Sequence, residues 1–322
     1  MKKTILLILI IFCSCNNNEI EGTWIGAYTL IISEDRKSIE SLNTIIKIED
    51  NRFYNQVLER ENNRKPFSFE FTISGNSIIS KDKTHRGFNI ESFSKDSLVL
   101  SIPQMEDIKL VYRKLPNKNN KIRWNPTGKS YRFEGNKSVA YNEYINDSIM
   151  IEFNVDHESV SVNQWWLENY ETYTFLLLKY PISTFPFLID STSTKNVHLT
   201  NFDDKIRNYK YQQQTKPKSI DIEGKWNLTD KKYDTISSSF IPFSRNRIQQ
   251  LDISKDSVKI TFGDFERVKN YGWSTSVTNK LIFLIDKEYA ILKVLSLDHN
   301  EMALEIGLEP NEYKKRLIYR RE

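Results

Sequence analysis

The chain has 322 residues, of which 27% are charged, and its formal net charge is only +4 at pH 7. A balance so close to neutral argues against nucleic acid as a partner. Ten glycines are few for building phosphate-binding loops. The length allows two or three domains, each with its own core.

The N-terminus has the pattern of a secretion signal. Two lysines precede an apolar run, residues 5–12, that is too short to span a bilayer as a helix. The end of the run resembles a bacterial lipoprotein signal, in which a small residue precedes the cysteine that receives the lipid. This resemblance implies a signal of residues 1–14, a lipid anchor on Cys15 and a tether of residues 15–19. The alternative is an ordinary secreted protein that loses both cysteines with its signal.

Residues 20–115 form the first predicted module. Apolar residues alternate over short runs, as in half-buried strands, and pairs such as Asp50-Asn51 and Gly75-Asn76 suit tight antiparallel turns. The predicted strands are residues 23–32, 41–49, 52–58, 66–74, 77–81, 87–93, 97–102 and 107–114. Eight strands in up-and-down order close most naturally into a barrel, because closure removes exposed sheet edges.

A short motif shows that this module is repeated. The sequence Ile-Glu-Gly-x-Trp begins at residue 20 and again at residue 222, and each copy is followed about ninety residues later by a basic, aromatic strand, residues 110–114 and 317–321. Residues 220–322 therefore form a second barrel with the same plan. Its predicted strands are residues 225–230, 247–253, 257–262, 272–278, 280–285, 290–297, 302–308 and 315–321.

The stretch between these modules, residues 122–214, has the length of a further barrel. Its opening motif differs, with Tyr131 where the other modules have tryptophan. Two interpretations stay open, a divergent third barrel and a different β-rich insert. The predicted fold class is thus all-β, with tandem small eight-stranded up-and-down antiparallel barrels.

A Gly-x-Trp on the first strand, eight antiparallel strands and an arginine on the last strand together resemble the lipocalin and lipocalin-like families. In those proteins the tryptophan closes one end of the barrel and the arginine lies across its ring, an arrangement that contributes roughly 0.5–2 kcal/mol. The glycine lets the backbone pass close to the neighbouring strand. The resemblance implies these closure residues: Gly22, Trp24, Arg113, Gly224, Trp226 and Arg320. They bear on fold and not on function.

The sequence lacks the motifs of common catalytic sites. Its four histidines have no metal-binding spacing, and no nucleophile elbow, P-loop or dinucleotide glycine pattern occurs. We therefore expect no catalytic residues, no metal and no cofactor. The one concentrated feature is an aromatic cluster with the ligand-binding candidates Trp165, Trp166 and Tyr170. Aromatic rings bind sugars and apolar ligands but also fill cores, and Trp165 with Tyr170 is the pair expected to be exposed.

These features predict a lipoprotein of the cell envelope, anchored in the membrane through Cys15, on the outer membrane, and acting as a non-catalytic binding or interaction module. A small apolar ligand is the first expectation. One alternative is an inhibitor or immunity-type protein that acts on a protein partner. A second is a glycan-binding surface lipoprotein that uses Trp165 and Trp166. Short strands favour barrel interiors filled by side chains.

Overall fold

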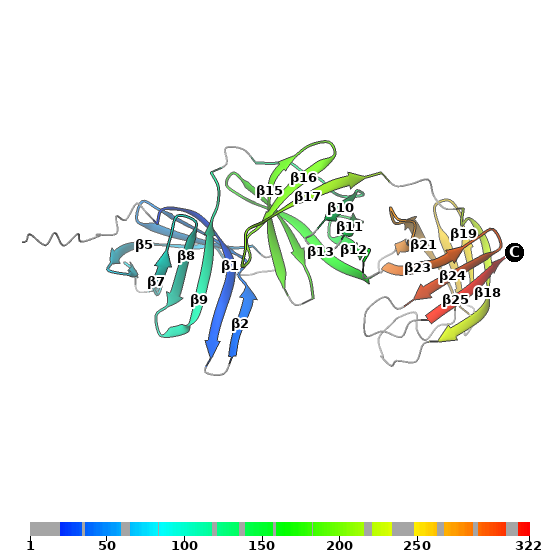
Figure 1. The fold of residues 1–322 in the computed structure, drawn as a ribbon, viewed down its shortest axis with the longest axis horizontal. Coiled ribbons are helices and arrows are strands. Elements are labelled where there is room, and N and C mark those ends of the chain that lie inside the picture. Colours follow the sequence, from blue (N-terminus) through cyan, green and yellow to red (C-terminus); the bar gives the residue numbers. More distant parts are fainter. Residues whose placement is uncertain are drawn as a thin grey trace, which may run out of the picture.

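The computed structural model describes residues 20–33, 36–58, 65–82, 84–117, 121–134, 139–156, 159–181, 183–215, 221–233, 248–262, 267–285, 289–306 and 315–322. Cys15 and the predicted signal lie outside these residues. All described elements are strands, and they form three closed eight-stranded antiparallel barrels that follow one another in chain order (Figure 1). The described part contains no helix long and apolar enough to cross a membrane.

Barrel 1 closes through the pairing of its first and last strands, as the sequence predicts. Its strands are β1 (Gly22–Ser33), β2 (Arg36–Ser41), β3 (Thr44–Glu49), β4 (Arg52–Val57), β5 (Phe67–Ser74), β6 (Ser77–Ser80), β7 (Phe88–Phe93), β8 (Ser97–Ile102) and β9 (Met105–Lys114). The sequence prediction missed β2. This strand pairs with the second half of β1, beyond the point where β3 stops pairing with it, so it adds a ribbon to a ring of eight.

Barrel 2 is a closed eight-stranded barrel, which settles the open question about the middle of the chain in favour of a third barrel. Its strands are β10 (Ser130–Glu134), β11 (Val139–Tyr144), β12 (Ile149–Asn154), β13 (Ser159–Tyr170), β14 (Tyr173–Lys179), β15 (Thr184–Thr192), β16 (Asn196–Asn201) and β17 (Arg207–Gln214). Tyr131 is buried, and its hydroxyl accepts a hydrogen bond from Trp124 Nε1 at 3.0 Å. Trp124 thus supplies the indole that the opening motif lacks.

Barrel 3 follows the predicted plan, and its last strand pairs with its first. Its strands are β18 (Gly224–Tyr233), β19 (Ile248–Ile253), β20 (Val258–Phe262), β21 (Arg267–Thr275), β22 (Leu281–Ile285), β23 (Tyr289–Leu297), β24 (Glu301–Ile306) and β25 (Lys315–Arg321). Its described interior is an apolar cluster around Trp226 and Tyr319.

The two tryptophans of the repeated motif have the same environment. Trp24 and Trp226 are fully buried, and each indole Nε1 donates to a backbone oxygen four residues earlier, Ile20 O at 3.1 Å and Ile222 O at 2.8 Å. In each copy, the backbone oxygen of the isoleucine that begins the motif therefore accepts a hydrogen bond from the tryptophan of the same motif. The isoleucine side chains are buried in the same apolar clusters as the tryptophans, Ile20 with Trp24 and Ile222 with Trp226.

The predicted cations over these indoles are wrong by one residue. Lys114 Nζ lies 5.1 Å from the Trp24 ring, and the guanidinium carbon of Arg321 lies 4.7 Å from the Trp226 ring. The register explains the correction, because Lys114 is directly opposite Trp24 and Arg321 is directly opposite Trp226. Directly opposed residues of an antiparallel pair share a face of the sheet.

Arg113 and Arg320, one residue earlier, point elsewhere. Arg113 Nη2 donates to Asp204 O of barrel 2 at 3.2 Å, and Arg320 is an exposed side chain 3.9 Å from Glu301. The glycines have the expected close contact in barrel 1, where a Cβ on Gly22 would lie 2.8 Å from Lys114 Cε. Gly22 and Gly224 also have φ angles of 139° and 136°, which favour glycine.

Apolar surfaces join the barrels. Ile25, Ile45, Leu58 and Leu115 of barrel 1 form one buried cluster with residues of barrel 2 that include Phe175 and Leu177. A second cluster joins barrel 2 to barrel 3 through Ile151, Phe153, Val160, Leu281 and Phe283. The array is therefore held together by buried contacts between the barrels.

Candidate functional site

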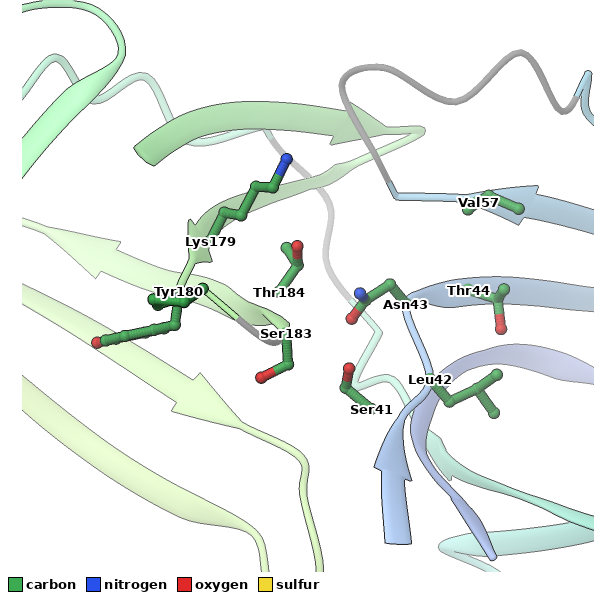
Figure 2. Close-up of a pocket in the computed structure, with 10 residues that line it drawn as sticks. Ser41, Leu42, Asn43, Thr44, Val57, Lys179, Tyr180, Ser183 and Thr184 are labelled. Atoms are coloured by element: carbon green, nitrogen blue, oxygen red, sulfur yellow. The ribbon is translucent and has the colours of Figure 1, made fainter. Parts of the chain in front are cut away.

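A polar cleft of about 340 Å³ lies between barrels 1 and 2. Figure 2 shows that its two walls come from distant parts of the chain, one from the turn between β2 and β3 and the other from the turn between β14 and β15. The lining residues are Ser41, Leu42, Asn43, Thr44, Val57, Lys179, Tyr180, Pro181, Ser183 and Thr184. Hydroxyl and amide groups dominate this set.

The barrel 1 wall depends on a close backbone approach at Gly26. A Cβ on Gly26 would lie 2.3 Å from Leu42 O and 2.5 Å from Leu42 Cγ, closer than real atoms approach. The missing side chain lets the turn between β2 and β3 lie directly on β1. The backbone oxygen of the next residue, Asn43, accepts a hydrogen bond from Leu58 N at 2.8 Å, which fixes the turn from the other side.

Asn43 is the most informative residue of the cleft. It is 9% exposed, and among the residues that the structure describes its Oδ1 has no hydrogen-bond partner. In Figure 2 its side-chain amide points toward Ser183 and Thr184 on the opposite wall. A buried amide oxygen without a partner loses the free energy of its water contacts, at a cost of about 1–3 kcal/mol.

The barrel 2 wall is held by Tyr180. Its backbone N donates to Ser183 O at 2.8 Å, which closes the turn, and its hydroxyl donates to Glu152 Oε2 at 3.0 Å. The hydroxyl points away from the cleft in Figure 2, so only the part of the Tyr180 side chain nearest the backbone borders the cleft. Burial raises the pKa of Glu152, and the hydrogen bond from Tyr180 acts in the opposite direction.

Ionic and apolar contacts keep the two walls in place. Lys47 of barrel 1 forms ion pairs with Glu49 at 2.7 Å and with Glu171 of barrel 2 at 2.9 Å. Hydrogen bonds to Glu49 and Glu171 raise the pKa of Lys47, although partial burial lowers it. Since the apolar cluster around Phe175 lies in the same interface, the cleft has preformed walls.

The predicted aromatic platform is not formed. Trp165, expected to be exposed, is buried inside barrel 2, where its Nε1 donates to Asn146 O at 2.9 Å and its ring meets Tyr144 edge to face. Trp166 lies on the opposite face of β13, in the interface with barrel 1. Tyr170 is half-buried in that interface, and burial raises its pKa to about 12. The prediction of an exposed Trp165–Tyr170 pair is therefore wrong, because both tryptophans of β13 pack into cores.

The residues of the cleft carried no strong signal in the sequence. Serine, threonine and asparagine are common in turns, so the sequence does not distinguish Ser41, Asn43 and Ser183 from ordinary turn residues. One weak signal existed, since Asn43 is a polar residue between Leu42 and the pair Ile45-Ile46, inside a stretch predicted to be a strand. Among the described residues, no group of three or more histidine, cysteine, aspartate or glutamate side chains is placed to hold a metal ion.

No family model matches the chain, and no curated protein matches it. Solved structures with some likeness include a protein of unknown function from the DUF3598 family of Nostoc punctiforme, at 8% identity and a TM-score of 0.17, covering 95% of this chain and 97% of the other. Transferrin binding protein B from Neisseria meningitidis has 10% identity, coverages of 93% and 75%, and a TM-score of 0.17. The Haemophilus parasuis protein of the same name, a double mutant, has 8% identity, the same coverages and a TM-score of 0.18. At these TM-scores neither the fold nor the function of those proteins carries over to this chain.

Proposed function

We propose that the chain is a lipid-anchored protein of the bacterial cell envelope that acts as a non-catalytic binding module, with its ligand in the cleft between barrels 1 and 2. The observation that carries the proposal is the polar cleft itself, whose lining includes Asn43, a buried side chain with no partner for its Oδ1 among the described residues. Ligand N–H and O–H groups can pair with the hydroxyl and amide groups of the lining.

The chemistry of the walls defines the ligand class. Hydroxyls of Ser41, Ser183 and Thr184 can donate or accept, and apolar atoms of Leu42 and Val57 border them. The one charged lining residue, Lys179, is exposed, so a hydrogen-bonding ligand that needs no charge of its own matches this mixture. None of the lining residues is a histidine, carboxylate or cysteine that could serve as general base or thiol nucleophile, which supports binding over catalysis.

An NMR titration of the mature chain tests the cleft. With N-acetylglucosamine and N-acetyl amino-acid amides as probes, we expect chemical-shift changes that gather on Asn43, Ser183 and Thr184, and binding at least fivefold weaker in Asn43→Leu. Asn163→Leu is the matched control, because Asn163 Oδ1 is also buried without a described partner but lies outside the cleft. Equal weakening in both variants, or shifts centred elsewhere, would contradict the proposal.

The anchor is tested separately by metabolic labelling with radioactive palmitate. We expect the wild type and Cys13→Ala to incorporate label and Cys15→Ala to lose it. Label retained in Cys15→Ala would show that the anchor assignment is wrong, whatever the result for the cleft.

A further inference from the structure

β2 is an edge strand that leads into the cleft. Among the described strands it pairs only with β1, and it stands at the end of the strand order of barrel 1. With β1 it forms a ribbon that extends away from the body of the barrel (Figure 1). Its residues from Arg36 to Glu40 are all exposed, and Ile39 is 61% exposed.

The register assigns the backbone groups of the free edge. Ser33 lies opposite Arg36 at the end of the β1–β2 ladder, with two residues between them in the sequence, and an antiparallel pair at that spacing exchanges hydrogen bonds. Because the direction of backbone groups alternates along a strand, the N–H and C=O groups of Lys37, Ile39 and Ser41 face away from β1. They offer a row of unpaired donors and acceptors.

The side chains of the ribbon supply further contacts. Ile39 is directly opposite Leu30, so it shares a face with Ile32, which is 41% exposed. Two cations, Arg36 and Lys37, stand at the far end of the same strand. The edge thus combines backbone pairing groups, an apolar face and positive charge.

The edge is continuous with the cleft. Ser41 is the last residue of β2 and also lines the cleft, next to Leu42 and Asn43. A strand added antiparallel to β2 would have its first residues at the cleft and its last residues beside Arg36 and Lys37.

We propose that β2 binds an extended, acidic segment of a protein partner by strand addition, with the start of that segment in the cleft. Main-chain hydrogen bonds to Lys37, Ile39 and Ser41 give the affinity, and carboxylates opposite Arg36 and Lys37 set the direction. The proposal rests on the proposed function only for the cleft end of the segment. Because Glu40 repels a carboxylate, the acidic residues of the partner segment must lie opposite the other end of β2, beside Arg36 and Lys37.

The probe is a fluorescein-labelled, capped seven-residue peptide of alternating threonine and valine with two glutamates near its C-terminus. The control peptide carries two lysines at the same positions. By fluorescence anisotropy with the mature chain we expect the acidic peptide to bind at least tenfold more tightly than the basic one. The double variant Arg36→Glu/Lys37→Glu should reverse this preference.

Two further variants locate the binding. Ile39→Pro removes a free-edge N–H at a position where an edge strand tolerates proline, and it should weaken peptide binding at least tenfold. Asn43→Leu should leave most peptide binding intact while it weakens binding of the small probes in the cleft at least fivefold. If the wild-type chain binds the acidic peptide but none of the small probes, the proposed ligand site in the cleft is refuted and strand addition at β2 is not.

Three results would overturn the inference. They are equal binding of the acidic and basic peptides, unchanged binding in Ile39→Pro, and absence of binding to either peptide. The last result, together with self-association of Lys37→Val, would show that the charges on β2 only protect the edge from aggregation.

Discussion

Barrels 2 and 3 have the same strand order and both have apolar interiors, but barrel 2 also encloses polar contacts. The described interior of barrel 3 is an apolar cluster around Trp226. Barrel 2 has an apolar cluster too, and beside it Tyr180 donates to Glu152 at 3.0 Å and Asn142 Nδ2 donates to the Tyr211 hydroxyl at 2.9 Å. Burial raises the pKa of Tyr211, as expected for a phenol that has left water.

The outer surfaces of barrels 2 and 3 also differ, because barrel 2 has apolar contacts with a neighbouring barrel on two sides. Six of the seven residues of β14 are buried, since Leu176 and Leu178 face the interior while Phe175 and Leu177 contact barrel 1. Barrel 2 also contacts barrel 3 through Phe153. The middle barrel is thus stabilised on its outside by both neighbours, whereas barrel 3 depends more on its interior. This comparison predicts where each barrel is sensitive to substitution.

The largest effect is expected at the interior of barrel 3. Trp226→Ala removes a fully buried indole, with its hydrogen bond to Ile222 O, and should lower the free energy of unfolding by about 3–5 kcal/mol. Denaturant titration with hydrogen exchange should show early opening of barrel 3 while amides of β3 and β4 stay protected. Simultaneous loss of protection in barrel 1 would contradict a local effect.

The next effect separates the two faces of β14. Leu177→Ala should cost about 2–5 kcal/mol and should reduce protection in both barrel 1 and barrel 2, because Leu177 lies in their shared cluster. Leu176→Ala is the matched control, an equally buried leucine that faces the interior of barrel 2. If both variants leave barrel 1 unchanged, the interface does not couple the barrels.

These faces also show what sequence could and could not predict. Alternating apolar residues gave the strands of barrels 1 and 3, because those strands are buried mainly on one face. The all-β tandem-barrel fold is confirmed. In β14 the alternation disappears, since a strand buried on both faces reads as a continuous apolar run. The same effect misplaced Trp165, because alternate residues of β13 serve two different cores.

Other features needed three-dimensional information. The β2 strand is mostly polar and its residues from Arg36 to Glu40 are exposed, so no alternation of buried and exposed residues marks it in the sequence. To predict which cation lies over each indole, the register between the first and last strands must be known. An error of one residue in that register gave Arg113 in place of Lys114 and Arg320 in place of Arg321. The cleft joins turns more than a hundred residues apart in the sequence, which local patterns cannot relate.

The third prediction concerns the polar interior of barrel 2. Burial raises the pKa of Glu152 above its usual 4.5, so the folded chain retains a proton that the unfolded chain loses, and stability falls as the pH rises through that interval. We expect Glu152→Gln, which can still accept from Tyr180, to match the wild type at pH 4 and to exceed it at pH 8. Thermal unfolding at the two pH values measures this, and a gain of equal size at pH 4 would rule out titration of Glu152 as its source.

The smallest effect distinguishes neighbouring arginines in barrel 3. Arg321 lies over the Trp226 ring and donates through Nη2 to Asp221 O and Glu223 O, each at 3.0 Å, whereas Arg320 is exposed. Arg321→Met keeps an apolar contact with the indole but loses the cation and these bonds, so we expect a cost of about 1–2 kcal/mol. Arg320→Met should change stability by less than about 0.5 kcal/mol, as surface substitutions usually do.

Denaturant midpoints of the two variants, compared with the wild type, measure the difference. Equal costs would mean that the cation over the indole contributes nothing beyond the general charge of the strand, and a larger cost in Arg320→Met would contradict the register on which the closure of barrel 3 depends.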